Sequence, residues 1–243
     1  MDFSLILVLF FIIAFVYSTV GHGGASGYLA LMVFLNFVPE QIRPTALVLN
    51  VLVSAIASMQ YYRSGYFKKE LFIPLILLSV PLAFLGSRVQ LSPSVFKIIL
   101  GICLLLSVIR ILGLIGNNSG ETLRKMPLLI ALLIGGGIGL ISGMIGIGGG
   151  ILLSPILLLF RWADIKQTAA LAAPFILVNS LSGLAGLMSR HLVFPDRMMW
   201  WVLATLIGGL LGSYWGSHRF NSVVLKYLLA TVLLFAAGKL LMV

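Results

Sequence analysis

Charged residues are scarce in this chain of 243 residues, where Asp, Glu, Lys and Arg together make up 9%. A soluble domain carries about 25% charged residues, because its surface must be solvated by water. Here 60% of the residues are hydrophobic, and the mean hydropathy is +1.16. This composition excludes a soluble enzyme, a nucleic-acid-binding domain and a disordered chain. It predicts a polytopic membrane protein, since each crossing helix needs roughly 20 apolar residues.

Acidic residues are especially few. All six fall in predicted loops or at the ends of apolar segments: Asp2, Glu40, Glu70, Glu121, Asp164 and Asp196. Carriers of metal cations, drug cations or protons usually keep a carboxylate within the membrane as a ligand or relay. The lack of such a carboxylate argues against cation transport and favours a neutral or anionic substrate.

The sequence also lacks motifs of catalysis and of bound cofactors. Cys103 is the only cysteine, which excludes an intramolecular disulfide and a cysteine metal cluster. The chain contains no HExxH or GxSxG motif, and no Lys-Ser or Lys-Thr follows its glycine clusters as in a Walker nucleotide-binding loop. We therefore expect no enzymatic activity, no cofactor, no metal site and no ATP-driven transport.

Basic residues outnumber acidic ones, and the formal net charge is +10. They stand singly or in pairs between apolar runs, as at Arg63, Arg88 and Arg219. Nucleic-acid binding requires basic residues clustered on one face, whereas scattered cationic loops help to orient membrane spans. The expected partner is therefore the lipid bilayer and not nucleic acid.

Two parts of the chain repeat the same order of features. In each, an apolar segment runs into a glycine cluster, a short apolar segment follows, and a polar turn leads into a long apolar segment. The closing segments are also alike, with Lys97 and Lys226 in equivalent places. A spacing of roughly 125–130 residues exceeds that of solenoid repeats and suits the internal duplication of many secondary transporters.

We therefore predict an all-α polytopic membrane protein of about eight to ten transmembrane or half-membrane helices. They form two homologous halves, each with a glycine-broken helix. The first membrane repeat covers residues 1–115, a polar linker covers 116–126, and the second membrane repeat covers 127–243. The apolar segments fall at about 4–20, 27–37, 44–62, 71–87, 94–114, 127–145, 151–160, 168–188, 197–215 and 223–242.

The two glycine clusters, GHGG at 21–24 and GIGGG at 146–150, are the most informative features. Glycine costs about 1 kcal/mol relative to alanine inside a helix, so each cluster is expected to break the helix. In a membrane a broken backbone persists only against protein or a polar cavity. The short segments that follow span about half of the bilayer, and the N–H groups at the start of such a half-helix favour an anion.

We predict that the substrate is bound by both clusters and by polar side chains of the long segments that follow them. The predicted residues are Gly21, His22, Gly23, Gly24, Ala25, Ser26, Thr45, Asn50, Gly146, Gly148, Gly149, Gly150, Ile151, Thr168 and Asn179.

Alternative interpretations remain for parts of this site. The threonines and asparagines are also ordinary links between membrane helices, and His22 either contacts the substrate, couples transport to protons or bonds to backbone at a helix end. Close helix packing is the favoured role of two glycine stripes with four-residue spacing, which are also candidates for a homodimer contact. These stripes are Gly135, Gly139, Gly143, Gly208, Gly212 and Gly216.

The second cluster continues as GIGGGILLSP at 146–155, a glycine cluster followed by an apolar stretch and a proline. This segment resembles the signature of the TauE/SafE sulfite exporter family, also called the 4-toluene sulfonate uptake permease family. The repeat spacing and the Gly-Ser pairs at 86–87 and 216–217 agree with this resemblance, which covers essentially the whole chain. The first copy departs from the signature, with His22 inserted and Ala30 in place of the proline.

The resemblance implies a multi-pass secondary transporter of the bacterial inner membrane that moves sulfite, sulfonates, thiosulfate or related organosulfur anions. We expect alternating access around a site between the two halves. The direction of transport and the coupling ion, H⁺ or Na⁺, stay open, as does the choice between inverted and parallel repeats. An uncoupled anion channel and a membrane subunit that anchors a partner enzyme are the alternative functions.

Overall fold

The computed structural model describes residues 2–89, 123–188 and 192–221 continuously, with scattered residues in 92–109 and 223–238. Within these residues the chain is helical and has no strand, which confirms the predicted all-α polytopic fold class. The helices are α1 (Phe3–Ser18), α2 (Ala25–Phe34), α3 (Pro39–Arg63), α4 (Lys69–Ser87), α6 (Leu128–Ile145), α7 (Gly150–Leu159), α8 (Ile165–Leu187) and α9 (Met198–His218).

Five of these helices, α3, α4, α6, α8 and α9, are long and apolar enough to cross a membrane. The helices α1, α2 and α7 are shorter and also apolar. The predicted segments 94–114 and 223–242 and most of the predicted linker 116–126 lie outside the described residues. The domain boundaries that depend on them therefore stay predictions.

Each glycine cluster lies between a longer apolar helix, α1 or α6, and a short helix of ten residues. The helices α2 and α7 begin directly after Gly24 and Gly149, whose φ angles are 94° and 82°. An L side chain is disfavoured in this left-handed conformation, so glycine is the residue suited to both positions. The prediction that short helices follow the clusters agrees with this geometry.

The backbone around α2 and α7 also matches at equivalent positions. Just after α1, the N–H of His22 donates to the carbonyl of Tyr17 in the last turn of that helix. Just after α6, the N–H of Ile147 donates in the same way to the carbonyl of Ser142. Two residues after the end of each short helix stands a residue with positive φ, 54° at Asn36 and 57° at Arg161. The two parts of the chain thus share one local geometry at the same sequence offset.

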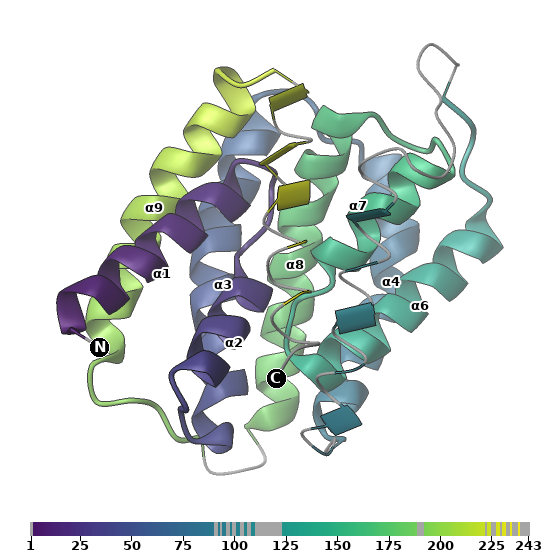
Figure 1. Ribbon diagram of the computed structural model, residues 1–243. Helices are drawn as coiled ribbons and strands as arrows, with labels where there is room; N and C mark the ends of the chain where they lie inside the picture. The colour runs from purple at the N-terminus through teal and green to yellow at the C-terminus, as the bar shows by residue number, and fades with distance from the viewer. Residues whose placement is uncertain are drawn as a thin grey trace.

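The long helices α3 and α8 pack against each other at the centre and run in opposite directions. Asn50 contacts Ser180, whereas Tyr61, further along α3, lies in a cluster with Ala169, near the start of α8. The starts of α3 and α8 therefore lie at opposite ends of the molecule. The pairs α1/α9 and α4/α6 lie on either side of this central pair (Figure 1).

The two glycine stripes hold these outer pairs together. In α6, glycines face carbonyl groups of α4, as Gly139 does with Ser79, and in α9 they face carbonyl groups of α1, as Gly212 does with Phe15. A Cβ at these glycines would overlap the carbonyl. Because residue numbers rise together along each pair, the paired helices are parallel. The packing role predicted for the stripes is confirmed. The homodimer stays a prediction, and the stripe glycines that contact α4 and α1 are already used within the chain.

A substitution at Gly139 tests this packing. We expect Gly139→Ala to lower the free energy of unfolding by about 1–3 kcal/mol, the usual effect of overpacking, because its Cβ meets backbone of α4. Gly137→Ala is the matched control on the same helix, since no atom lies within 4 Å of a Cβ there. Thermal unfolding in detergent measures both variants, and equal melting temperatures would contradict the packing argument.

Candidate functional site

The two glycine clusters meet at the side chain of Asn50, which is fully buried in the middle of α3. Its oxygen accepts the N–H of Ala25, the first residue of α2, at 3.2 Å. Its nitrogen donates to the Ser180 hydroxyl of α8 at 2.9 Å and to the Ile147 carbonyl at 3.4 Å. One carboxamide thus links the first cluster, the second cluster and both central helices.

Glycine is required on both sides of this carboxamide. A Cβ on Gly23 would overlap the carboxamide oxygen of Asn50, and one on Gly148 would approach its nitrogen. The clusters therefore approach the side chain closely from the two halves of the chain. The prediction placed Asn50 near the clusters, and in this structure its amide bonds the protein itself.

His22 makes a second contact between the halves. Its Nε2 lies 2.8 Å from the Ser154 hydroxyl of α7, and that hydroxyl lies 3.0 Å from the Gly150 carbonyl. Because a serine hydroxyl has one hydrogen, donation to Gly150 requires that Nε2 carry the imidazole proton, which is an inferred tautomer. His22 is 1% exposed, and its Nδ1 has no hydrogen-bond partner among the described residues.

Two tyrosines, which the sequence analysis did not select, lie at the start of α2. The Ser26 hydroxyl donates to the Tyr17 hydroxyl at 2.9 Å. The Tyr28 side chain folds back toward Gly24, where a Cβ would lie 2.7 Å from the Tyr28 oxygen. For Tyr28, a detectable signal was a tyrosine four residues after a helix-breaking glycine, within a segment whose only other polar side chain is Ser26.

The other predicted polar residues are used differently. Asn179 accepts a hydrogen bond from Ser79 of α4 at 2.6 Å and donates to the Phe175 carbonyl of its own helix at 2.8 Å. Its amide therefore links α8 to α4. Thr45 and Thr168 are buried, and their hydroxyls have no partner among the described residues. Their role at the substrate stays a prediction.

The remaining cluster glycines differ in their surroundings. Gly21 packs against the backbone of Ala169, near the start of α8, whereas Gly146 is nearest to Arg43 and Leu47, near the start of α3. These two glycines therefore lie toward opposite ends of the molecule. Gly150 lies next to His22 and Ile176, so the inner ends of the two clusters meet at the centre.

Two basic side chains lie beyond the clusters, near the starts of α3 and α8. Arg43 donates to the carbonyl groups of Gly143 at 2.8 Å and Ser87 at 3.1 Å, at the ends of α6 and α4. Lys166 donates to the carbonyl groups of Gly216 at 2.7 Å and Phe220 at 2.8 Å, at the end of α9. A cation stabilises the negative end of a helix dipole, so each side chain binds a helix end at its own side of the molecule.

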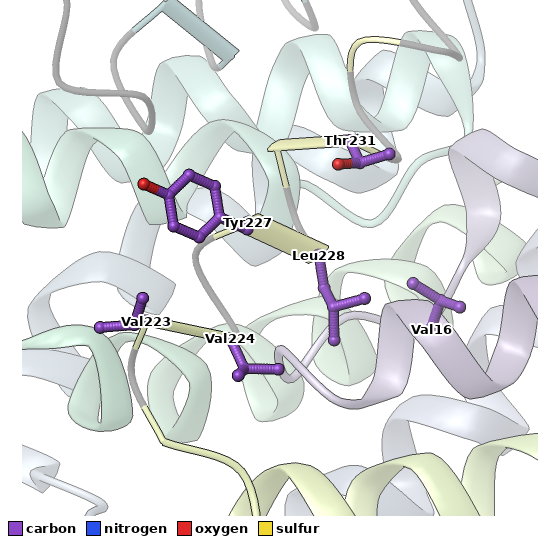
Figure 2. Close-up of a pocket in the computed structure, with 6 residues that line it drawn as sticks. All are labelled: Val16, Val223, Val224, Tyr227, Leu228 and Thr231. Carbon is purple, nitrogen blue, oxygen red and sulfur yellow. The ribbon is translucent and has the colours of Figure 1, made fainter.

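In the ranges that the structure describes, no three His, Cys, Asp or Glu side chains come together as a metal site requires. A pocket between α1 and the C-terminal segment is lined by Val16, Val223, Val224, Tyr227, Leu228 and Thr231 (Figure 2). None of these six residues is charged, and five of them present mainly apolar or aromatic surface, so this pocket lacks the features of an anion site.

Comparisons with known proteins identify the family. The family model described as sulfite exporter TauE/SafE matches residues 6–240. The chain belongs to the TauE/SafE sulfite exporter family. A relative from Sinorhizobium fredii (strain NBRC 101917 / NGR234), described as "Probable membrane transporter protein y4hK", is 36% identical over 237 residues, which cover 96% of each chain. No solved structure matches the chain significantly.

The family and the apolar helices agree on the class of protein. This TauE/SafE member is a multi-pass membrane protein of a transporter family, as the signature at 146–155 predicted. The bacterial relative agrees with the expected inner-membrane location. Membrane transport is therefore the function shared with the relatives, and neither the family nor the relative is described as an enzyme.

Substitution of Asn50 tests the contact between the clusters. Asn50→Ala leaves the Ala25 N–H and the Ser180 hydroxyl without their partner, and one buried unpaired group costs about 1–3 kcal/mol. We expect a lower melting temperature in detergent and a loss of transport. Ser58→Ala is the control, because the Ser58 hydroxyl bonds only the carbonyl of Ser54 within α3 in the described contacts. An Asn50→Ala protein as stable and active as the control would contradict the linking role.

Proposed function

We propose that this protein is a secondary transporter that moves small sulfur-containing anions across the membrane by alternating access. The substrates are sulfite, sulfonates, thiosulfate or related organosulfur compounds, and the binding site lies between the glycine clusters. The observation that carries the proposal is the contact of both clusters with Asn50 in the buried centre of the protein.

The electrostatics of the centre support an anionic substrate. The starts of α2 and α7 lie at the clusters, and the start of a helix carries a partial positive charge from its free N–H groups. The acidic residues that the structure describes lie in loops or first turns, as Glu40, Glu70 and Asp164 do. An anion at the clusters therefore meets favourable dipoles and no carboxylate from these helices.

The contacts of Asn50 indicate that its side chain occupies the substrate position in this closed state. The carboxamide oxygen accepts the first N–H of α2, which is a position that an anion oxygen would occupy at a helix start. In the proposed cycle the substrate takes this N–H and Asn50 turns to bind the substrate. The cluster glycines allow the required close approach of backbone, since a Cβ on Gly23 or Gly148 would fill the space.

The arrangement of the helices supports alternating access between two homologous halves, 1–115 and 127–243. Equivalent backbone conformations recur around α2 and α7, and α3 and α8 run in opposite directions. Such an inverted pair of repeats is a common basis of alternating access, because exchanging the conformations of the two halves turns an outward-facing state into an inward-facing one.

Transport in proteoliposomes tests the proposal. We expect saturable uptake of radiolabelled sulfite or sulfonate, with counterflow, and a dependence on a H⁺ or Na⁺ gradient that identifies the coupling ion. Gly149→Leu is expected to abolish uptake, because its Cβ meets Ile138 at 2.8 Å and Phe175 at 2.9 Å at a left-handed backbone position. Gly137→Leu is the control, since Gly137 is exposed and unobstructed.

Each other outcome points to a different conclusion. Absence of flux for every sulfur-containing anion would refute the substrate class. A flux that exceeds the turnover rate of a carrier and shows no counterflow would identify an uncoupled channel. Folded protein without any flux that tolerates Gly149→Leu would favour a membrane subunit that anchors a partner enzyme.

The two basic side chains allow a separate test of alternating access. Arg43 and Lys166 bind helix ends at opposite sides of the molecule, so each is expected to hold one side closed. In a Cys103→Ser background, Ser54→Cys places a buried thiol reporter one turn after Asn50. We expect Arg43→Gln to increase maleimide labelling from the side where α3 begins, and Lys166→Gln from the opposite side. An increase from the same side in both variants would contradict the two-gate arrangement.

A further inference from the structure

The hydroxyl of Tyr28 is a buried polar group that no described residue bonds. Tyr28 is 0% exposed, and its oxygen has no hydrogen-bond partner among the described residues. The side chain turns back toward Gly24, the residue that precedes the first turn of α2. Leaving a hydroxyl unpaired in an apolar environment is unfavourable, so an unpaired hydroxyl at the start of a helix indicates a ligand that accepts its hydrogen.

A second donor lies at the same turn. The Ser26 hydroxyl donates to the Tyr17 hydroxyl, so the two hydroxyls share one of their two hydrogens and the hydrogen of Tyr17 stays available to a ligand. Tyr17 is 2% exposed, and its ring lies 3.1 Å from the position of a Cβ on Gly27, in the first turn of α2. The start of α2 thus carries two tyrosine hydroxyls in addition to its N–H groups.

His22 closes the group on the side of α7. Its ring centroid lies 6.5 Å from that of Tyr17, and its Nε2 is bonded to Ser154. Its buried Nδ1 has no partner among the described residues, and with Nε2 protonated this atom is an acceptor, so His22 adds no donor for an anion. The first half of the chain therefore supplies three polar side chains around one helix start.

The equivalent positions of the second half lack the two tyrosines and the histidine. At the offset that pairs Gly24 with Gly149, Tyr28 corresponds to Leu153 and Ser26 to Ile151. His22 corresponds to Ile147. Ser142 takes the place of Tyr17, and the side chains of Ile138, Phe175 and Ser142 lie next to Gly149. The start of α7 therefore has mainly apolar neighbours and one serine, where the start of α2 has two tyrosine hydroxyls and that of Ser26.

We propose that the transported oxoanion binds on one side of the pseudo-symmetric centre, at the start of α2, with the hydroxyls of Tyr28 and Tyr17 as its side-chain donors. Hydroxyl and N–H donors suit a small anion with several acceptor oxygens. The cluster before α7 then forms the opposite wall through its backbone. This assignment rests on the proposed function and adds the residues that hold the substrate.

Sulfite binding to the purified full-length protein tests the assignment by calorimetry in detergent. Tyr28→Phe removes only the hydroxyl, so we expect an unchanged or higher melting temperature and a Kd for sulfite raised about tenfold or more, the effect of one hydrogen bond to a charged group. Tyr17→Phe is expected to weaken binding in the same direction. Tyr62→Phe is the matched control, because Tyr62 is 67% exposed at the end of α3.

The outcomes separate this assignment from the proposed function. Equal Kd values for Tyr28→Phe, Tyr17→Phe and the wild type would overturn the tyrosine assignment, while sulfite flux by the same proteins would leave the transporter intact. Tyrosine-dependent binding without flux would support the site and refute transport. A wild-type protein that does not bind sulfite would overturn both the tyrosine site and the sulfur-anion assignment.

Discussion

The hydrogen bonds of one carboxamide, that of Asn50, join the parts of the chain on which the centre depends. Asn50 binds the start of α2, the second glycine cluster and α8 from its place in α3. These contacts are stable because they lie in a buried environment, where an amide has no water to replace a lost partner. The positions of the two short helices relative to each other therefore depend on this side chain and on the glycines that let backbone approach it.

Glycine acts in two physically different ways around this centre. In α6 and α9 it removes side-chain bulk, so that the backbones of parallel neighbours approach closely, which is how helices associate in a solvent as apolar as themselves. At Gly24 and Gly149 it permits a left-handed backbone conformation that starts a new helix within the membrane protein. The stripes fix the outer helix pairs, and the clusters create the helix starts between them.

The two regions around the glycine clusters have the same local backbone and differ in chemistry. The turns that end α2 and α7 have equivalent hydrogen bonds and positive φ angles, whereas Tyr28 and His22 stand where the second half has Leu153 and Ile147. A repeated backbone provides two helix starts that face one centre. Divergent side chains give the start of α2 tyrosine donors and leave the start of α7 with mainly apolar neighbours, which is the basis of the one-sided site proposed above.

Local features of the sequence determined the helical class, the two short helices after the glycine clusters and the packing role of the glycine stripes. Apolar length, helix breakers and four-residue spacing act over a few residues, so the sequence expresses them directly. Tertiary structure decided which buried polar residue serves which contact: Asn50 meets both clusters, whereas Asn179 is bonded to α4, although both are asparagines in long apolar helices. It also decided the opposite directions of α3 and α8 and brought Tyr17 and Tyr28 to the start of α2. These features depend on which faces of distant helices meet, and the periodicity within each helix does not specify its neighbour.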